Sequence, residues 1–157
     1  MAQPQAEQQQ ASFNIEKLYV KDLSLELPNA PQVFMEAESP QLDVQIHNES
    51  DHVSDSYYEV VVTVTVTAKA GEKTLFLAEV AQAGLFSIVN VPAEELEPLL
   101  GIGCPTILYP YVREAISDLV TRGGFPPVLL APVSFEALYV QRQQEGKDKQ
   151  SRIEIAH

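Results

Sequence analysis

The sequence has few cysteines and few basic residues, which excludes several classes of protein. Its 157 residues include one cysteine, so an internal disulfide is excluded and a reducing compartment is favoured. It contains 10 lysine and arginine residues against 22 aspartate and glutamate residues, and the formal net charge of -12 disfavours binding to nucleic-acid phosphates. This charge favours a basic partner surface, although it also serves solubility.

Long hydrophobic runs are absent as well. No apolar stretch approaches the ~20 residues that a helix needs to span a bilayer. Residues 1–12 are polar and rich in glutamine, without the apolar segment of a signal peptide, and we expect a disordered leader. The 45% hydrophobic content without a break in composition predicts one soluble, cytoplasmic domain over residues 13–144, followed by a flexible charged tail at 145–157.

Catalytic and metal-binding motifs are also missing. Residues 84–87 lack the glycine pattern of a nucleophile elbow, and residues 101–103 are only a fragment of a dinucleotide-binding fingerprint. Cys104 has no neighbouring base, which favours a small buried residue over a nucleophile. Four clustered residues could suggest a metal site, but they lack the sequence spacing of known metal ligands, which favours a polar loop. They are His47, Glu49, Asp51 and His52.

Residues 57–89 carry the clearest pattern, a β-hairpin with its turn at residues 70–72. Valines at even positions alternate with threonines at odd positions in residues 62–67, so one face of the sheet is apolar. A pairing of Val66 with Phe76 would continue that face onto the second strand. The face with the odd-numbered residues carries Leu77 and Glu79, and it is too apolar to face solvent and too polar to form a core. This mixture predicts oligomerisation and a partner surface.

Residues 13–27 predict a further strand, with Tyr19 and Leu23 on one face and Asp22 and Glu26 on the other. The two carboxylates would lie roughly 13 Å apart, too far to share a proton as a catalytic pair, but suited to a charged docking surface. Prolines end this strand at residues 28–31. The following segments predict extended structure at 32–38, a short strand at 42–46 and a loop at 47–56.

Helices are expected only after the strands. Residues 93–100 have helical composition, 101–105 form an irregular link, and 106–122 predict a helix that is apolar nearly all round and therefore buried on more than one side. Pro110 predicts that the regular part begins close to it. After a proline-rich crossover, residues 134–144 predict a second helix. Strands followed by helices indicate the α+β class with an antiparallel sheet.

Aromatic side chains gather around the crossover and its flanking helices. Most of them fit an ordinary core, yet a rigid apolar crossover over a helix also suits a groove for extended apolar peptide. The predicted groove residues are Phe34, Phe86, Tyr109, Phe125, Phe135 and Tyr139. Two other interpretations stay open: a small enzyme with an apolar pocket, and an acidic oligomeric adapter that binds no unfolded client.

Several segments, in order, resemble the SecB family of bacterial protein-export chaperones over roughly residues 13–144. They are residues 19–31, 58–61, 76–80, 84–88, 104–111 and 123–133. The resemblance implies a homotetramer, built as a dimer of dimers, in which four-stranded antiparallel sheets join and sandwich the first long helix. It also implies a cytoplasmic chaperone without enzymatic activity or cofactor. Such a chaperone holds non-native preproteins and passes them to SecA at the translocon, where the zinc involved belongs to SecA.

The resemblance also assigns roles to individual residues. Asp22, Glu26, Leu77 and Glu79 match the surface that receives SecA. Six further residues are expected at the tetramer interface, three on the second hairpin strand and three on the first long helix. They are Ala78, Val80, Gln82, Val112, Ile116 and Leu119. Glu38 departs from the family, because an aromatic residue is common near this position, and makes that part of a client groove less apolar.

Overall fold

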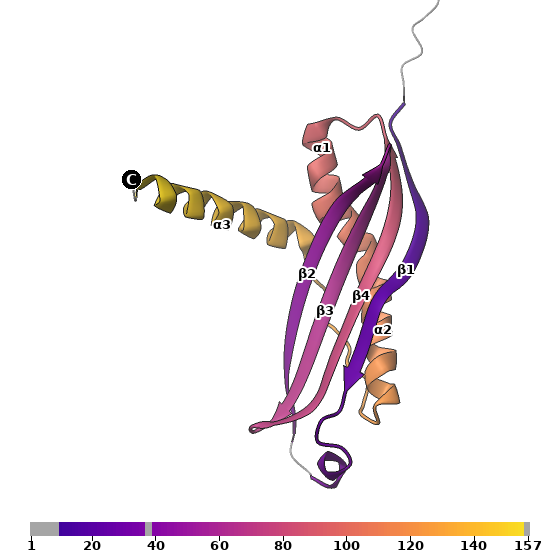
Figure 1. Ribbon diagram of the computed structural model, residues 1–157, viewed down its shortest axis with the longest axis vertical. Helices are drawn as coiled ribbons and strands as arrows, with labels where there is room; N and C mark the ends of the chain where they lie inside the picture. Colours follow the sequence, from indigo (N-terminus) through magenta and orange to yellow (C-terminus); the bar gives the residue numbers. More distant parts are fainter. Residues whose placement is uncertain (1–9, 37–38, 156–157) are drawn as a thin grey trace, which may run out of the picture.

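The structure, a computed structural model, describes residues 10–36 and 39–155. Within these residues, the strands form one four-stranded antiparallel sheet in the order β1-β4-β3-β2, and the α-helices follow the strands in the chain (Figure 1). The predicted α+β architecture, an antiparallel sheet followed by a proline-rich crossover between helices, is therefore confirmed. The strands are β1 (Ser12–Glu26), β2 (Gln41–Ser54), β3 (Tyr57–Ala70) and β4 (Lys73–Val89).

The β3–β4 hairpin lies at the centre of the sheet, as predicted. Gly71 has a φ angle of 62° in the turn, a left-handed conformation that glycine adopts without steric cost. The predicted partner of Val66 was wrong by two residues, because Val66 lies opposite Ala78. A two-residue turn and a register shift after Ala68 together cause this offset. A shift of two residues keeps side chains on their faces, so the predicted faces are confirmed from Phe76 onward, whereas Leu75, at the register shift, is buried in the core cluster.

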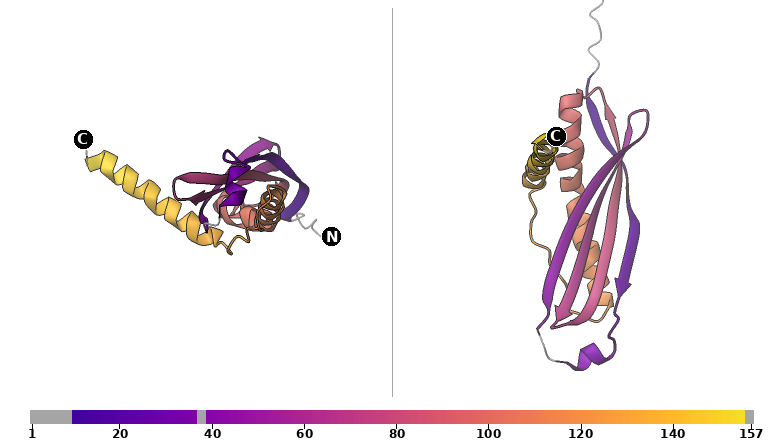
Figure 2. Two further views of the ribbon diagram at one scale, coloured as in Figure 1. Left: turned by 90° about the horizontal axis from the view of Figure 1, so that it is seen from below. Right: turned by 60° about the vertical axis from the view of Figure 1, so that its left-hand side comes forward.

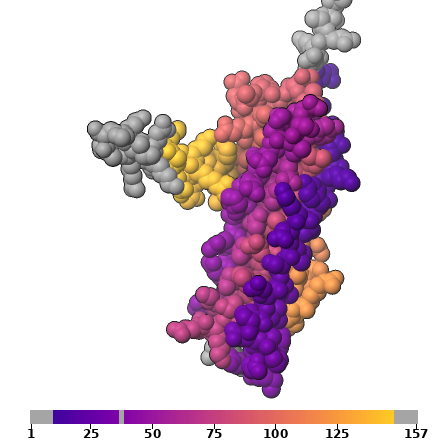
Figure 3. Space-filling view, viewed as in Figure 1, coloured from indigo at the N-terminus to yellow at the C-terminus, as the bar shows by residue number. Residues whose placement is uncertain are grey.

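The two faces of the sheet differ in cover. Val60, Val62, Val64 and Val66 are 0% exposed on what we call the core face, and each such burial contributes roughly 1.5–3 kcal/mol. The opposite side carries the odd-numbered residues of β3 and, from Leu77 onward, those of β4, and is called the open face. No described helix lies over it, and the strands form the surface there (Figure 3).

Strand β1 departs from simple alternation. Its register against β4 shifts between Ile15 and Lys17 and again between Val20 and Asp22. Tyr19 consequently lies opposite Ala83 on the open face, whereas Leu23 lies opposite Val80 on the core face. The prediction that Tyr19 and Leu23 share a face was therefore wrong, because each extra residue inverts the faces of the residues that follow it.

The segments before the hairpin also differ from the prediction. The strand predicted at 42–46 is confirmed but is longer than predicted, and the loop predicted at 47–56 was wrong, because β2 pairs with β3 from Gln41 to Ser54. As an edge strand with mostly exposed residues, β2 has a polar composition that is also typical of loops. The prediction of extended structure at 32–38 was wrong too, because Gln32–Met35 forms a 3₁₀ helix, η1. Residues 37 and 38 lie outside the described residues, and so does the prediction on Glu38.

One continuous helical run covers the core face (Figure 2). It consists of α1 (Ala93–Pro98), the π-helix η2 (Leu99–Gly103) and α2 (Cys104–Arg122). The predicted irregular link at 101–105 and the predicted helix start near Pro110 were wrong, because the wide π turn keeps the run helical and Pro110 lies inside α2. Pro105 occupies the first turn of α2, where a missing N–H is tolerated.

Helix α3 runs over Phe135–Ile155 and projects away from the sheet (Figure 1). The prediction that this helix ends at Gln144 was wrong, because Gly146 does not interrupt it. The flexibility of residues 145–157 stays a prediction. Residues 1–9 of the expected leader lie outside the described residues.

Candidate functional site

The open face brings together the four residues assigned to SecA. In the β1–β4 pairing, Glu26 lies opposite Leu77, and Ser24 lies opposite Glu79. Directly paired residues of antiparallel strands project from the same face of the sheet. Asp22 pairs with Ala81 and projects from this face as well. The structure therefore gathers three carboxylates and one leucine on a single surface, which we call the docking face.

Glu79 is held in place on this surface. Thr65 Oγ1 donates a hydrogen bond to Glu79 Oε2 at 2.9 Å, between residues that are direct partners on β3 and β4. The Glu79 side chain is half-buried, in contrast to the exposed Asp22 and Glu26. The sheet itself thus orients the Glu79 carboxylate.

A further cluster on the open face was missed by the sequence analysis. Tyr19 Oη donates to Glu59 Oε2, and Lys21 Nζ donates to Glu59 Oε1 at 2.6 Å. These hydrogen bonds, first that of Lys21 and then that of Tyr19, lower the pKa of Glu59 below its usual value. Burial and the Glu59 carboxylate raise the pKa of Tyr19 to about 12. No sequence signal identifies the cluster, because its members are 38 and 40 residues apart.

The six residues expected at the tetramer interface lie inside the protomer. Ala78, Val80 and Gln82 are on the core face of β4, and the helical members lie on the inner side of α2. Each of the six is at most 7% exposed. None of them therefore offers surface to a second copy directly. The exposed residues of α2 are different ones, and include Tyr111, Arg113 and Asp118.

The six aromatic groove residues do not line one groove. Phe86 is fully buried and stacks on Phe13 with ring centroids 5.5 Å apart. Tyr109 and Phe135 pack edge to face in the core at 5.7 Å, and Tyr109 Oη donates to the Ala131 carbonyl.

The other three aromatic residues are more accessible. Phe34 is exposed and packs on Phe125 at 5.2 Å, and Phe125 continues to Phe76 at 5.0 Å. Tyr139 lies apart from them on α3, against η2. Exposed apolar surface near the crossover extends to Met35, which is 88% exposed, and Leu129, which is 81% exposed.

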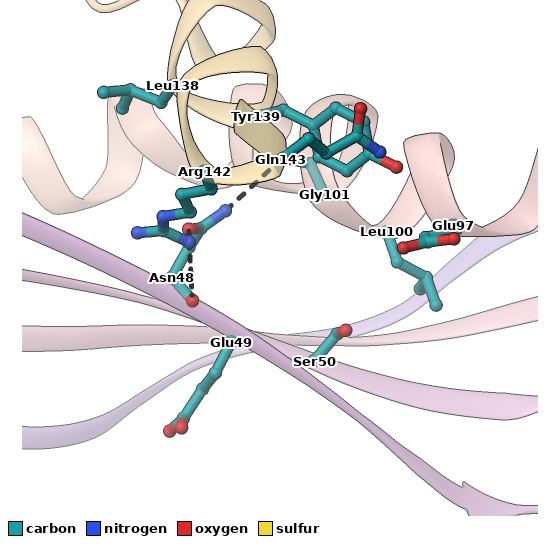
Figure 4. A pocket seen from close by; sticks show the side chains of 10 residues that line it. All are labelled: Asn48, Glu49, Ser50, Glu97, Leu100, Gly101, Leu138, Tyr139, Arg142 and Gln143. Carbon is teal, nitrogen blue, oxygen red and sulfur yellow. Dashed lines mark hydrogen bonds between the residues drawn. The ribbon is translucent and has the colours of Figure 1, made fainter. Parts of the chain in front are cut away.

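A hollow of about 300 Å³ lies between β2, the α1–η2 run and the start of α3 (Figure 4). Tyr139 packs directly on Gly101, where an added Cβ would come within 2.8 Å of the ring. Asn48 of β2 contacts both helical elements. Its side-chain amide donates to the Gly101 carbonyl at 3.4 Å, and its backbone carbonyl accepts a hydrogen bond from Arg142 at 3.3 Å. The lining residues are Asn48, Glu49, Ser50, Glu97, Leu100, Gly101, Leu138, Tyr139, Arg142 and Gln143.

Asn48 thus contacts the backbone of the π-helix η2 through Gly101 and also contacts Arg142 of α3. The start of α3 is thereby fastened to the body of the protomer.

The residues considered for metal binding or nucleophilic chemistry do not form a site. His47 and Glu49 project from the open face 3.9 Å apart, whereas His52 projects from the other face and contacts the Asp55 carbonyl at 2.6 Å. Among the described residues no group of three or more potential ligands is placed to hold a metal ion. Burial raises the pKa of the Cys104 thiol to about 12, so the thiolate nucleophile is disfavoured. Among the described helices, none is both long and apolar enough to cross a membrane.

Comparison with known proteins agrees with this architecture. A SecB-like chaperone of Mycobacterium tuberculosis, solved with a ChAD peptide from the HigA1 antitoxin, has a TM-score of 0.64 at 22% sequence identity. The similarity covers 78% of this chain and 91% of that chain, and at this identity it concerns the fold.

Sequence comparison is more specific. The protein-export protein SecB of Methylobacillus flagellatus is 59% identical over 143 residues, which cover 91% of this chain and 91% of the relative. The SecB of Chromobacterium violaceum is 58% identical over 136 residues, 87% of this chain and 91% of the relative. The family model described as preprotein translocase subunit SecB matches residues 6–146. The chain therefore belongs to the SecB family of protein-export chaperones.

Proposed function

We propose that this chain is an ATP-independent chaperone that holds non-native preproteins in an export-competent state and delivers them to SecA at the translocon. One observation carries the proposal: the protomer presents exposed apolar side chains near its crossover and a separate acidic docking face on the other side of the sheet. A carrier needs both surfaces at once, because it must hold its client while it binds the next component. It would act in the cytoplasm, without a cofactor or enzymatic step.

Clients would bind through burial of apolar surface. Phe34, Met35 and Leu129 expose apolar atoms, and burial contributes about 25 cal/mol per Å² whatever the client sequence. Phe125 and Tyr139 border this region and the hollow. We therefore assign client contact to the accessible aromatic residues. The buried Phe86, Tyr109 and Phe135 belong to the core instead.

The chaperone would act as a homotetramer, a dimer of dimers. The exposed side of α2, including Tyr111, is the surface that a sandwiched helix presents to the other copies. The six buried residues expected at this interface would act indirectly, by fixing α2 on the core face. Several client sites on one particle add avidity for a single long chain.

SecA would bind the docking face mainly through electrostatic attraction, with Leu77 as an apolar contact. The double substitution Asp22→Lys and Glu26→Lys should lower SecA affinity by at least about tenfold and leave aggregation suppression intact. Binding measured by calorimetry at low and moderate salt tests this assignment. An unchanged affinity would remove Asp22 and Glu26 from the docking face.

The chaperone activity itself is tested by light scattering of a denatured protein diluted into buffer. The full chain, at stoichiometric amounts and without ATP, should suppress aggregation. An acidic adapter or a small enzyme with an apolar pocket would leave the scattering unchanged, and that result contradicts the proposal.

A further inference from the structure

The orientation of Asp22 depends on a β-bulge. Val20 lies opposite Gln82 and Asp22 lies opposite Ala81, so two steps along β1 correspond to one step along β4. Lys21 is the extra residue. Without it, a strand that has Tyr19 on the open face would direct Lys21 and Leu23 to the open face and Asp22 to the core face.

Packing alone does not fix where this extra residue sits. Leu25 and Leu27 lie near Gly123 at the end of α2, and they hold the last part of β1 on the core face. A bulge anywhere between Tyr19 and Leu25 would satisfy those leucines. Only a bulge before Asp22 also places Asp22 on the open face.

Glu59 holds the extra residue, Lys21, and also Tyr19 two residues before it. It lies on β3, opposite Leu85 of β4, and its two carboxylate oxygens accept from Tyr19 and Lys21 respectively. The side chains of Tyr19 and Lys21 therefore reach over β4 to a common acceptor. Ala83 and Val61, at 0% and 4% exposure, are buried on this otherwise open face, as expected beneath such a bridge.

This bridge differs from an ordinary surface ion pair. Exposed pairs contribute about 0–1 kcal/mol because water and salt screen them. The Lys21 side chain is 51% exposed, but the Glu59 side chain is only 17% exposed, and its carboxylate accepts two charge-assisted hydrogen bonds that restrain two residues of the same strand. A restraint on both sides of Val20 holds β1 against the sheet up to Lys21, the residue directly before Asp22.

We propose that Glu59 is a positioning residue of the docking face: by holding Tyr19 and Lys21 it anchors β1 over the sheet up to the residue directly before Asp22 and thereby restrains Asp22 on the open face. Glu59 does not itself contact the partner. The orientation of Glu26 depends less on this bridge, because Leu25 and Leu27 hold that end of the strand. The role given to Asp22 rests on the proposed function, whereas the bridge and the bulge do not.

The first experiment needs no partner. Hydrogen–deuterium exchange of the full chain should be faster in residues 17–24 of Glu59→Ala than in the parent protein, and unchanged in the β3–β4 hairpin. Asp43→Ala is the matched control, because it removes one carboxylate from the open face of β2 outside the bridge. Glu59→Gln, which retains a hydrogen-bond acceptor, should restore part of the protection. Equal exchange in Glu59→Ala and the parent protein would overturn the proposal.

The second experiment measures SecA affinity by calorimetry. Glu59→Ala should weaken binding at least about fivefold and Asp43→Ala less than about twofold. Because Glu59 acts through Asp22, Glu59→Ala should not lower SecA affinity further in a variant that already carries Asp22→Asn. In a variant that carries Glu26→Gln, Glu59→Ala should lower SecA affinity nearly as much as in the parent protein. Equal losses in both backgrounds would overturn the positioning role. If the parent protein does not bind SecA at all, the proposed function fails and the exchange experiment alone decides the inference.

Discussion

Thr65 on β3 donates a hydrogen bond to the carboxylate of Glu79 on β4 at 2.9 Å. The two residues are direct cross-strand partners on the open face, so the carboxylate is oriented within the docking face. Thr65→Val should lower SecA affinity a few-fold and change the free energy of unfolding by no more than about 1.5 kcal/mol. Calorimetric titration with SecA and denaturant unfolding measure the two effects.

Thr63→Val is the matched control for this substitution, because Thr63 lies on the same face and pairs with Ala81. It should leave SecA binding unchanged. Equal effects of the two substitutions would show that the orientation of Glu79 is irrelevant to docking.

Gly101 and Tyr139 should be energetically coupled. A Cβ at position 101 would come within 2.8 Å of the Tyr139 ring, and overpacking of this kind costs about 1–3 kcal/mol. Alanine is otherwise a better helix former than glycine by about 1 kcal/mol. Gly101→Ala should therefore destabilise the parent protein but stabilise the Tyr139→Ala variant. Denaturant unfolding of the four proteins tests this, and the same sign in both backgrounds would contradict it.

The sequence predicted the parts of the fold in which pattern and environment agree. The valine and threonine alternation of β3 identifies both faces of the hairpin, because one face is buried and the other is not. Segment 47–54 gave no such signal, since an edge strand exposed on both faces has the composition of a loop. The helix boundaries predicted near Pro105 and Pro110 were wrong, because the π-helix η2 keeps the chain helical where the sequence suggests an irregular link.

The candidate site shows the same limit. The four residues that the resemblance assigns to SecA share one face of the sheet, and their role stays a prediction; they are Asp22, Glu26, Leu77 and Glu79. The bridge of Glu59 to Tyr19 and Lys21 could not be predicted from the sequence, because it joins residues 38 and 40 positions apart. Aromatic composition around the crossover did not separate core from surface. Phe86 and Phe135 are buried, whereas Phe34 is exposed, and only the packing of the elements decides between them.

The Glu59 bridge should make stability depend on pH in the acidic range. Hydrogen bonds from Lys21 and Tyr19 lower the pKa of Glu59 in the folded chain. A carboxyl group with a lowered folded pKa stabilises the fold at pH values above its unfolded pKa, about 4.3, and this contribution is lost as the pH falls through the folded pKa. The parent protein should therefore be more stable than Glu59→Gln near neutral pH, and the difference should shrink below about pH 4.

Unfolding curves of both proteins between neutral and acidic pH measure this difference in free energy. A difference that grows on acidification would contradict the assigned direction of the pKa shift.

Inner and outer residues of α2 should have separable effects. Ile116 is fully buried against the core face, and Ile116→Ala should lower the free energy of unfolding by about 2–5 kcal/mol. Tyr111 is exposed on the same helix, and Tyr111→Ala should weaken assembly with little loss of protomer stability. Denaturant unfolding and mass in solution report the two properties. Loss of assembly from Ile116→Ala alone, at unchanged stability, would place the interface on the inner residues.

The most direct test of the account is the mass of the full chain in solution, measured by light scattering alone and with a reduced, unfolded polypeptide. We predict four chains per particle without a client, and a heavier complex when the unfolded polypeptide is added in the absence of ATP. A monomer whose mass does not change on addition of the unfolded polypeptide would contradict the account.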